Sequence, residues 1–431
     1  MSFSPALTFY ATATVLLAPF ASLWLGARAR AGKEDPTRLK ERFGRYSQTR
    51  PDGRLIWLHA ASVGESGVAL SLIEAMAARD PSLSFVISTG TRTSAELVAR
   101  RAAPRTTHIY VPLDSAGAVR RFFTHWRPDL GVFLESELWP NLIGAAEKRG
   151  VPLALVNARM SPKSLARWQR WRAAGARLLK PFAFVAAADA RTAEALTRVR
   201  GAPVPLLGNL KLATRAPNVD AGARAALAAQ IGARPVWLAA STHDGEDEIA
   251  LDAHKRLLTS RPEALLIIAP RHPDRGEAIA ALAGGAPRRA RFEPIGKAPV
   301  YVADTLGELG LFYDLAPVAL VAGSLIYHLK GHNPIEPAKL NSAILTGPYF
   351  ESFQDVFDAI ITANGAVVVT DADELAGAVE RLLRDDAARQ NQTTAAHAAV
   401  GHGAEALDTT ASQLLALLPA HANHEATHAS A

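Results

Sequence analysis

Short apolar runs alternate with helix-forming stretches along most of this chain, and that alternation limits the fold more than any other feature. Strands buried on both faces read as continuous apolar runs, and helices between them indicate a parallel sheet covered on both sides. The predicted strands are 55–59, 84–88, 108–111, 130–134, 152–156 and 184–188, then 236–240, 264–269, 300–302, 318–322, 343–346 and 366–370. The sequence therefore predicts an α/β protein built from two Rossmann-like domains.

A polar, proline-containing break at Arg215-Ala216-Pro217-Asn218 separates the two sets of strands, and 431 residues suffice for two domains. Ligands in such domains bind beyond the carboxyl ends of the strands, so we expect the domains to face each other across a central cleft. The predicted parts are an anchor (1–30), an N-terminal Rossmann-like domain (31–213), a linker (214–222), a C-terminal Rossmann-like domain (223–418) and a disordered tail (419–431).

The N-terminal segment is apolar, with no charged residue from Ser2 to Ala27. A membrane span needs roughly 17–25 such residues. Nine Lys or Arg stand between Arg28 and Arg54 against four Asp or Glu, which predicts an anchor with the rest of the chain on the cytoplasmic face. A cleaved signal peptide would need a charged region before the apolar run, and a helix lying in the membrane interface is a further alternative.

Composition excludes several kinds of chemistry. Cysteine is absent, so no disulfide, thiolate nucleophile or cysteine metal site is available. The tail histidines His421, His424 and His428 lack the spacing and partner ligands of a metal site, and we expect no metal and no cofactor. The net charge of +6 is concentrated beside the anchor, and no recognition motif accompanies it, so we expect no nucleic-acid partner.

Two acidic segments follow strands of the first half. His59-Ala-Ala-Ser-Val-Gly-Glu65 leaves a strand and opens a helix, so Glu65 could serve as a general base, with Ser62 and Gly64 beside the acceptor. The Ser62-x-x-Glu65 spacing is equally that of a capping box. Glu135 and Glu137 follow the next strand and suit sugar hydroxyls, although Glu137 could instead simply begin a helix.

Three segments of the second half have the features of an anion and nucleotide site. Ser241 and Thr242 stand at a predicted helix N-terminus, which favours anions. Arg271, followed by His272, closes the next strand and could bind a phosphate or pair with a neighbouring acid. The last segment is a loop that we expect to cradle a phosphate with free backbone N–H groups, while Glu336 binds ribose or remains a solvated helix carboxylate. Its candidate residues are Gly323, Ser324, Gly331, His332, Asn333 and Glu336.

Five ordered segments together resemble those of the Kdo (3-deoxy-D-manno-octulosonic acid) transferases, from about Arg42 to Asp355, and the N-terminal anchor matches as well. The segments are His59-Ala-Ala-Ser-Val-Gly-Glu65, Glu135-Ser-Glu-Leu-Trp-Pro140, Ser241-Thr-His-Asp-Gly-Glu246, Pro270-Arg-His-Pro273 and Gly331-His-Asn-Pro-Ile-Glu-Pro-Ala338. Lys330 stands where the family more usually has a second Gly, and Asp244 and Asp247 stand where Glu is common.

The resemblance implies a GT-B glycosyltransferase of lipopolysaccharide biosynthesis at the inner membrane. Its expected partners are CMP-Kdo as donor and lipid A or its tetraacyl precursor, lipid IVA, as acceptor. It implies an inverting, metal-free transfer, with Glu65 in the position of the catalytic base. Two alternatives are a GT-B transferase that uses a UDP-sugar and a membrane-tethered nucleotide- or carbohydrate-binding protein without catalysis.

Overall fold

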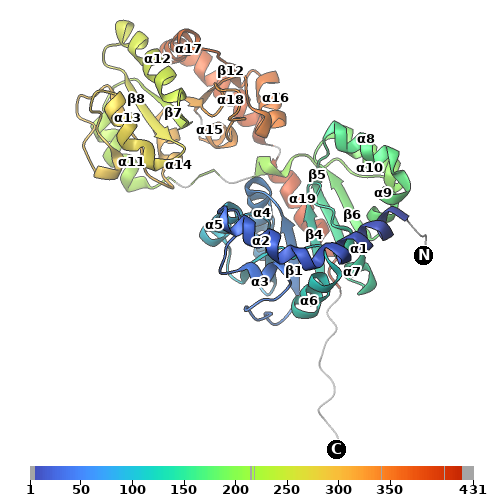
Figure 1. Cartoon of the computed structure of the whole chain (residues 1–431). Helices are drawn as coiled ribbons and strands as arrows, with labels where there is room; N and C mark the ends of the chain where they lie inside the picture. The colour runs from blue at the N-terminus through green and yellow to red at the C-terminus, as the bar shows by residue number, and fades with distance from the viewer. Residues whose placement is uncertain (1–4, 214–215, 218, 341, 402, 420–431) are drawn as a thin grey trace, which may run out of the picture. The chain divides into compact units, whose positions relative to one another are not determined.

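The computed structural model describes residues 5–213, 216–217, 219–340, 342–401 and 403–419. These residues form two compact units (Figure 1). Unit 1 contains the described residues up to 213 together with 403–419, and unit 2 contains those from 216 to 401. Part of the predicted linker, at 214, 215 and 218, and the predicted tail from residue 420 onward lie outside the described residues.

Unit 1 is a six-stranded parallel sheet in the order β3-β2-β1-β4-β5-β6, with helices on both faces. Its strands are β1 (Leu55–Ala60), β2 (Ser84–Thr89), β3 (Thr106–Tyr110), β4 (Leu130–Leu134), β5 (Leu153–Ala158) and β6 (Phe182–Ala187). Its helices are α1 (Pro5–Leu17), η1 (Ala18–Phe20), α2 (Ala21–Arg30), α3 (Leu39–Arg42), α4 (Val63–Arg79), α5 (Arg92–Arg101), α6 (Ala116–Trp126), α7 (Pro140–Lys148), α8 (Pro162–Arg170), α9 (Arg172–Leu179), α10 (Ala190–Arg200), η2 (Leu210–Ala213) and α19 (Gly403–Ala416).

Unit 2 repeats this topology with the order β12-β11-β10-β7-β8-β9, again all parallel. Its strands are β7 (Val236–Thr242), β8 (Leu265–Pro270), β9 (Val300–Val302), β10 (Val318–Val321), β11 (Ala343–Thr346) and β12 (Ala366–Val368). Its helices are α11 (Ala221–Ile231), α12 (Glu246–Ser260), η3 (Pro273–Arg275), α13 (Gly276–Leu282), η4 (Arg289–Arg291), α14 (Leu309–Leu315), α15 (Ile335–Lys339), η5 (Glu351–Phe353), α16 (Gln354–Thr362), α17 (Ala372–Arg384) and α18 (Asp386–Gly401).

The predicted strands are confirmed, each within two residues at either end, and so is the class of two Rossmann-like domains. Each sheet reverses direction once in its strand order, between β1 and β4 in unit 1 and between β7 and β10 in unit 2. In open parallel sheets ligands bind at this reversal, beyond the carboxyl ends of the strands. The fold therefore predicts that the site of each unit lies beyond the carboxyl ends of its central strands.

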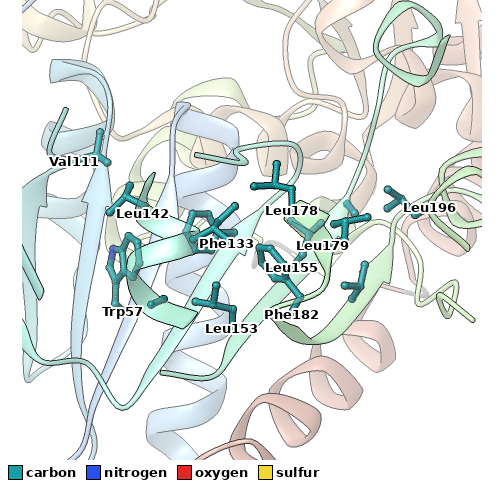
Figure 2. Packing of buried hydrophobic residues seen from close by; sticks show 14 of the residues in the cluster. Trp57, Val111, Phe133, Leu142, Leu153, Leu155, Leu178, Leu179, Phe182 and Leu196 are labelled. Carbon is teal, nitrogen blue, oxygen red and sulfur yellow. The ribbon is translucent and has the colours of Figure 1, made fainter. Parts of the chain in front are cut away.

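The core explains why the strands read as continuous apolar runs. In β1, Leu55 and Trp57 face the cluster drawn in Figure 2, which includes Phe133 and Phe182 of neighbouring strands. The alternate residues, such as Leu58, face a second cluster beneath α4, α5 and α19. Burying an aromatic or aliphatic side chain of this size contributes roughly 1.5–3 kcal/mol. Because both faces are covered, both sets of side chains must be apolar.

The C-terminal helix α19 belongs to unit 1, whereas residues up to 418 were predicted to end the second domain. Its apolar face, with Ala411 and Leu414, packs into the cluster that contains Val68 and Leu72 of α4. At its start Gly403 approaches the backbone of η2 so closely that a Cβ would lie 2.3 Å from the carbonyl carbon of Leu212. The chain thus returns to its first unit, a contact between distant segments that no local pattern in the sequence indicates.

The apolar N-terminal segment forms the nearly continuous helix Pro5–Arg30, interrupted at η1 by Pro19. It has 26 residues, and an 18-residue stretch of it has a mean hydropathy of 1.6, so it is long and apolar enough to cross a membrane. One side of it also rests on unit 1, where α1 packs against α6 and α7 (Figure 1). These features are those of a membrane-associated segment.

Candidate functional site

Glu65 lies in the first turn of α4, directly beyond the end of β1, and it is buried, with 6% of its surface exposed. Its Oε2 accepts the Ala61 N–H (2.8 Å) and its Oε1 accepts the Ser62 hydroxyl (2.7 Å), while the Ser62 Oγ caps the Glu65 N–H (3.3 Å). The Ser62 side chain thus caps the helix, while the Glu65 carboxylate reaches back to Ala61, one residue before the N-cap, in a variant of the capping box. Each carboxylate oxygen has two lone pairs, so these two bonds leave acceptor sites on Glu65.

A second carboxylate, Glu135, stands at the end of β4 beside Glu65. Its backbone is in the left-handed region (φ 54°), a conformation that costs energy for a side-chain-bearing residue. Its Oε1 forms a 2.6 Å ion pair with Lys211 Nζ. A Cβ on Gly64 would lie 3.5 Å from Lys211 Cε, so the stem of Lys211 runs directly over Gly64. Gly64, Glu65, Glu135 and Lys211 thus form one charged cluster.

Glu137 lies on the other side of the β4 loop, beside His59 and Trp139. The Trp139 indole N–H points at Glu137 Oε2 (3.0 Å) and His59 Nε2 (3.2 Å), and the last two atoms are 3.6 Å apart. The other ring nitrogen of His59 is hydrogen-bonded to Ser88 (3.0 Å) in the core. Glu137 is therefore held by its neighbours just before α7, which begins at Pro140, so it does not begin that helix.

The pKa values of Glu65 and Glu137 are shifted in opposite directions by their surroundings. Burial, and then the negative charge of Glu135, raise the pKa of Glu65 above its ordinary value. Burial also tends to raise the pKa of Glu137. The hydrogen bond and charge of His59, together with the hydrogen bond from the Trp139 N–H, outweigh burial, so the pKa of Glu137 is lowered. Pairs of acids whose environments push their pKa values apart are typical of acid–base sites.

In unit 2 the loop after β10 is organised around a buried carboxylate. Glu246, in the first turn of α12, accepts the N–H groups of Gly323 (2.7 Å), Ser324 (3.0 Å) and Leu325 (3.0 Å). A fourth hydrogen bond comes from the His243 N–H (3.1 Å). The prediction that backbone N–H groups of this loop are free for a phosphate is therefore wrong for these three residues. Glu246 occupies the place that an external anion would take.

Three histidines from different loops meet at the same edge of unit 2. His243 and His332 stack with ring centroids 5.1 Å apart and Nε2 atoms 2.9 Å apart, and the His243 ring contacts His272 edge-on at 5.9 Å. A Cβ on Gly323 would fall 2.5 Å from the His332 ring, so only glycine fits there. Burial, then the cationic neighbourhood, lowers the pKa of His332 to about 4. At neutral pH His332 is uncharged.

Arg271 and Arg275, four residues apart after β8, have different surroundings. Arg275 pairs with the buried Asp247 (2.5 Å) and donates to the Thr242 carbonyl (3.4 Å). The exposed guanidinium of Arg271 makes no hydrogen bond or ion pair with any residue that the structure describes. The sequence left two roles open for Arg271, binding a phosphate and pairing with a neighbouring acid. Arg275 makes the acid pair instead, so Arg271 remains available to a ligand.

Asn333 and Glu336 form a local pair at the start of α15. The Asn333 Oδ1 accepts the Ile335 N–H (3.0 Å) and its Nδ2 donates to Glu336 Oε1 (3.3 Å). Gly331 (φ 82°) packs so tightly that a Cβ would lie 2.6 Å from Phe350 Cα. Lys330 has φ 66°, a left-handed conformation that glycine adopts more readily than a residue with a side chain.

The remaining predicted residues are placed less favourably for direct contact with a ligand. Thr242 and Ser324 have no exposed surface. The Ser324 hydroxyl donates to the Val321 carbonyl (2.7 Å) and accepts the Gly347 N–H (2.7 Å), so it ties two loops together. Ser241 is half-buried at a bulge of β7 with φ 61°, a strained position next to the histidines.

Sequence reasoning missed Lys211, Trp139 and Glu246 as site residues. Glu246 ends a segment that was already singled out, so its position could have drawn attention to it, whereas Lys211 lies in η2, beyond α10, where no local pattern marks it. Their partners, Glu135 and Gly323, are 76 and 77 residues away. Only the folded chain shows the pairing.

Comparison with known proteins points to one family. Residues 37–214 match the model of the family described as 3-deoxy-D-manno-octulosonic-acid transferase (kdotransferase). A probable mitochondrial 3-deoxy-D-manno-octulosonic acid transferase of Arabidopsis thaliana is 35% identical over 395 residues, 87% of either chain. The Haemophilus influenzae 3-deoxy-D-manno-octulosonic acid transferase is 32% identical over 404 residues, 89% of this chain and 92% of that one.

Solved structures agree with the fold. A glycosyltransferase from Rickettsia africae, 11% identical, covers 85% of this chain and 99% of its own with a TM-score of 0.52. At that identity the match concerns architecture alone, and it is the two-domain architecture predicted here. On the evidence of its relatives, this chain belongs to the 3-deoxy-D-manno-octulosonic acid transferase family and is a glycosyltransferase.

Proposed function

We propose that this protein transfers Kdo from CMP-Kdo to lipid A or its tetraacyl precursor, with inversion at the anomeric carbon, on the cytoplasmic face of the inner membrane. One observation carries the proposal. Glu65, the residue in the position of the family's base, is a buried carboxylate at a strand end whose pKa is raised by burial and by Glu135. A base is most effective when its pKa approaches the working pH.

The proposed acceptor side is unit 1. Glu65 takes the proton from a sugar hydroxyl of the lipid as that hydroxyl attacks the anomeric carbon. The bonds from the Ala61 N–H and the Ser62 hydroxyl fix the carboxylate so that no side-chain rotation is needed during the reaction. Lys211, already paired with Glu135, adds a cation beside the acceptor, whose own phosphates are anionic.

The proposed donor side is unit 2. CMP leaves with its bonding electrons on the phosphate, and the Arg271 guanidinium, which has no partner among the described residues, supplies a bidentate donor for that oxyanion. His272, exposed beside it, is a second donor. Glu336, in the first turn of α15, accepts ribose hydroxyls. Because Glu246 occupies the N–H groups of the β10 loop, side chains rather than that loop's backbone stabilise the phosphate.

A single reaction tests the donor, the acceptor and the need for a metal. The purified full-length protein in detergent is incubated with lipid IVA and CMP-Kdo in the presence of EDTA, and the lipid is analysed by mass spectrometry. We expect the mass of one or more Kdo residues to be added and CMP to be released in equal number. NMR of the product should show the anomeric configuration opposite to that of the donor.

Three results would count against parts of this proposal. Transfer from a UDP-sugar but not from CMP-Kdo would establish the alternative donor. Nucleotide binding without CMP release, under conditions in which a related transferase is active, would contradict catalysis on this acceptor. Loss of transfer in EDTA that Mg²⁺ restores would contradict the metal-free reaction.

A further inference from the structure

A cavity of about 530 Å³ lies between the N-terminal helix and the body of unit 1. The helix supplies one wall, including Thr14, Leu17 and Ala21, and the opposite wall includes Phe43 and Leu113. The volume falls within the range of roughly 300–1,000 Å³ that is usual for small-molecule sites. The size and lining suit an elongated apolar group.

The two charged side chains that line this cavity, Asp114 and Arg121, are already bonded within the protein. Asp114 accepts the N–H groups of Asn141 (3.0 Å) and Leu142 (2.8 Å) at the start of α7, and it accepts the Tyr10 hydroxyl. Arg121 donates to the Phe43 carbonyl (2.7 Å). What the cavity offers to an occupant is therefore its apolar side-chain surface.

Trp139 connects the cavity to the acidic site. It lines the cavity, and its indole N–H points at Glu137 and His59 beside the proposed acceptor position. A molecule with a sugar head and an apolar tail could thus place its head at the site and its tail in the cavity. An indole, apolar in body with one polar N–H, suits such a boundary.

The helix itself places this cavity next to lipid. Its outward side carries exposed Phe9, Leu16, Leu23 and Trp24, the composition of a surface that enters a membrane interface. Its inward side is bonded to unit 1 through Asn141 Nδ2 and Thr14 Oγ1 (3.1 Å), and Leu25 is buried. The N-terminal helix thus covers the cavity with its inward side and presents apolar side chains to the bilayer with its outward side.

We propose that this cavity binds one acyl chain of the lipid acceptor and so positions the acceptor sugar beside Glu65. The inference rests on the proposed function and adds a subsite to it. The occupant is an acyl chain of the acceptor rather than of a bulk phospholipid, because Trp139 borders both the cavity and the acidic site.

The test compares lipid IVA with its de-acylated form as acceptors in detergent. Ala116, exposed at the start of α6, lines the cavity, and Ala116→Trp should fill it. The matched control is Thr12→Trp, which adds the same side chain at an exposed position of α1 outside the cavity lining. Far-UV circular dichroism and thermal melts check that both variants fold.

In the wild type, the KM for lipid IVA should be at least tenfold below that for the de-acylated acceptor, since two buried methylenes are worth roughly tenfold in affinity. Ala116→Trp should raise the KM for lipid IVA about tenfold or more, with kcat and the de-acylated reaction unchanged. Thr12→Trp should match the wild type. An unchanged KM ratio in Ala116→Trp, or an equal loss with both acceptors, would overturn the subsite.

A second measurement does not depend on turnover. Lipid IVA carrying a photoactivatable acyl chain is cross-linked to the wild type and to Ala116→Trp, and labelled peptides are identified by mass spectrometry. We expect labelling of peptides from 5–30 and 113–121 in the wild type, reduced in Ala116→Trp and displaced by unlabelled lipid IVA. Displacement by phosphatidylethanolamine at the same concentration, or labelling only elsewhere, would contradict the inference. Absence of Kdo transfer to either acceptor, with this labelling intact, would count against the proposed function alone.

Discussion

Glu246 and Gly323 meet across 77 residues of sequence, with the carboxylate of the first accepting the backbone N–H of the second at 2.7 Å. The bond joins the first turn of α12 to the loop after β10, the two segments that flank the reversal of strand order in unit 2. Glu246 therefore replaces an anion with a side chain and fixes the shape of the loop before any donor binds.

Removing this carboxylate should destabilise unit 2. Glu246→Ala leaves four backbone N–H groups without their acceptor, and a buried unsatisfied donor costs about 1–3 kcal/mol. We expect the free energy of unfolding to fall by at least about 3 kcal/mol in urea denaturation, together with a loss of donor affinity. Glu248→Gln, exposed in the same helical turn, is the control and should stay within about 0.5 kcal/mol of wild type. A similar loss in both variants would contradict the assignment.

Glu65→Gln separates the two roles that the sequence left open. Glutamine can take the same position of a capping box, so the free energy of unfolding should change little. It cannot accept a proton, and we expect kcat to fall by about 10²–10⁴-fold while the KM for CMP-Kdo stays near the wild-type value. Steady-state kinetics and a thermal melt measure both. Near-normal kcat would remove Glu65 as the base.

The pH dependence of transfer should report the neighbourhood of Glu65. Its pKa is raised, so kcat/KM should fall with decreasing pH at a pH above the ordinary glutamate value, as the base becomes protonated. Glu135→Gln removes the negative charge that raises this pKa and frees Lys211, and both changes favour the ionised base. The acid limb of the kcat/KM profile should therefore move to lower pH in Glu135→Gln. A shift to higher pH would contradict the electrostatic argument.

Arg271 and Arg275 should separate binding from stability. Arg271→Ala should raise the KM for CMP-Kdo about 10- to 100-fold with little change in the free energy of unfolding, because a bidentate phosphate contact is lost but no internal bond is. Arg275→Ala leaves the buried Asp247 without its ion pair and should lower the free energy of unfolding by about 2–4 kcal/mol. Donor titration and urea denaturation of both variants test this. A large loss of stability in Arg271→Ala, with a raised KM only in Arg275→Ala, would show that the two roles have been exchanged.

Two adjacent substitutions test the backbone of the last loop. Lys330→Gly relieves a left-handed side-chain-bearing residue and should raise the free energy of unfolding by about 1 kcal/mol. Gly331→Ala places a Cβ 2.6 Å from Phe350 Cα at φ 82° and should lower it by more than about 2 kcal/mol. Differential scanning calorimetry of the two variants measures the opposite signs. Equal destabilisation by both would contradict the conformational argument.

Much of the fold could be predicted from the sequence because it is recorded locally. Each strand shows as an apolar run, since both of its faces are buried, and the two sets of runs predict two parallel sheets. The capping box of Ser62 and Glu65 follows from a spacing of three residues. The family follows from five short segments in a fixed order, and the relatives confirm it.

The pairings that shape the candidate site could not be predicted, because they join segments distant in the chain. Lys211 reaches Glu135 only after β6 and β4 have taken their places in one sheet. The β10 loop looked able to cradle a phosphate, yet its N–H groups are bonded to Glu246. The return of α19 to unit 1 is of the same kind.

The sequence by itself thus determined the elements, their class, the family and most of the residues at the strand ends. The tertiary structure decided which of those residues are bonded to one another and which, like Arg271, remain available to a ligand. The physical reason is that periodicity and capping act within one or two helical turns, whereas the partner of a buried charge is chosen by whatever the fold brings within hydrogen-bond distance.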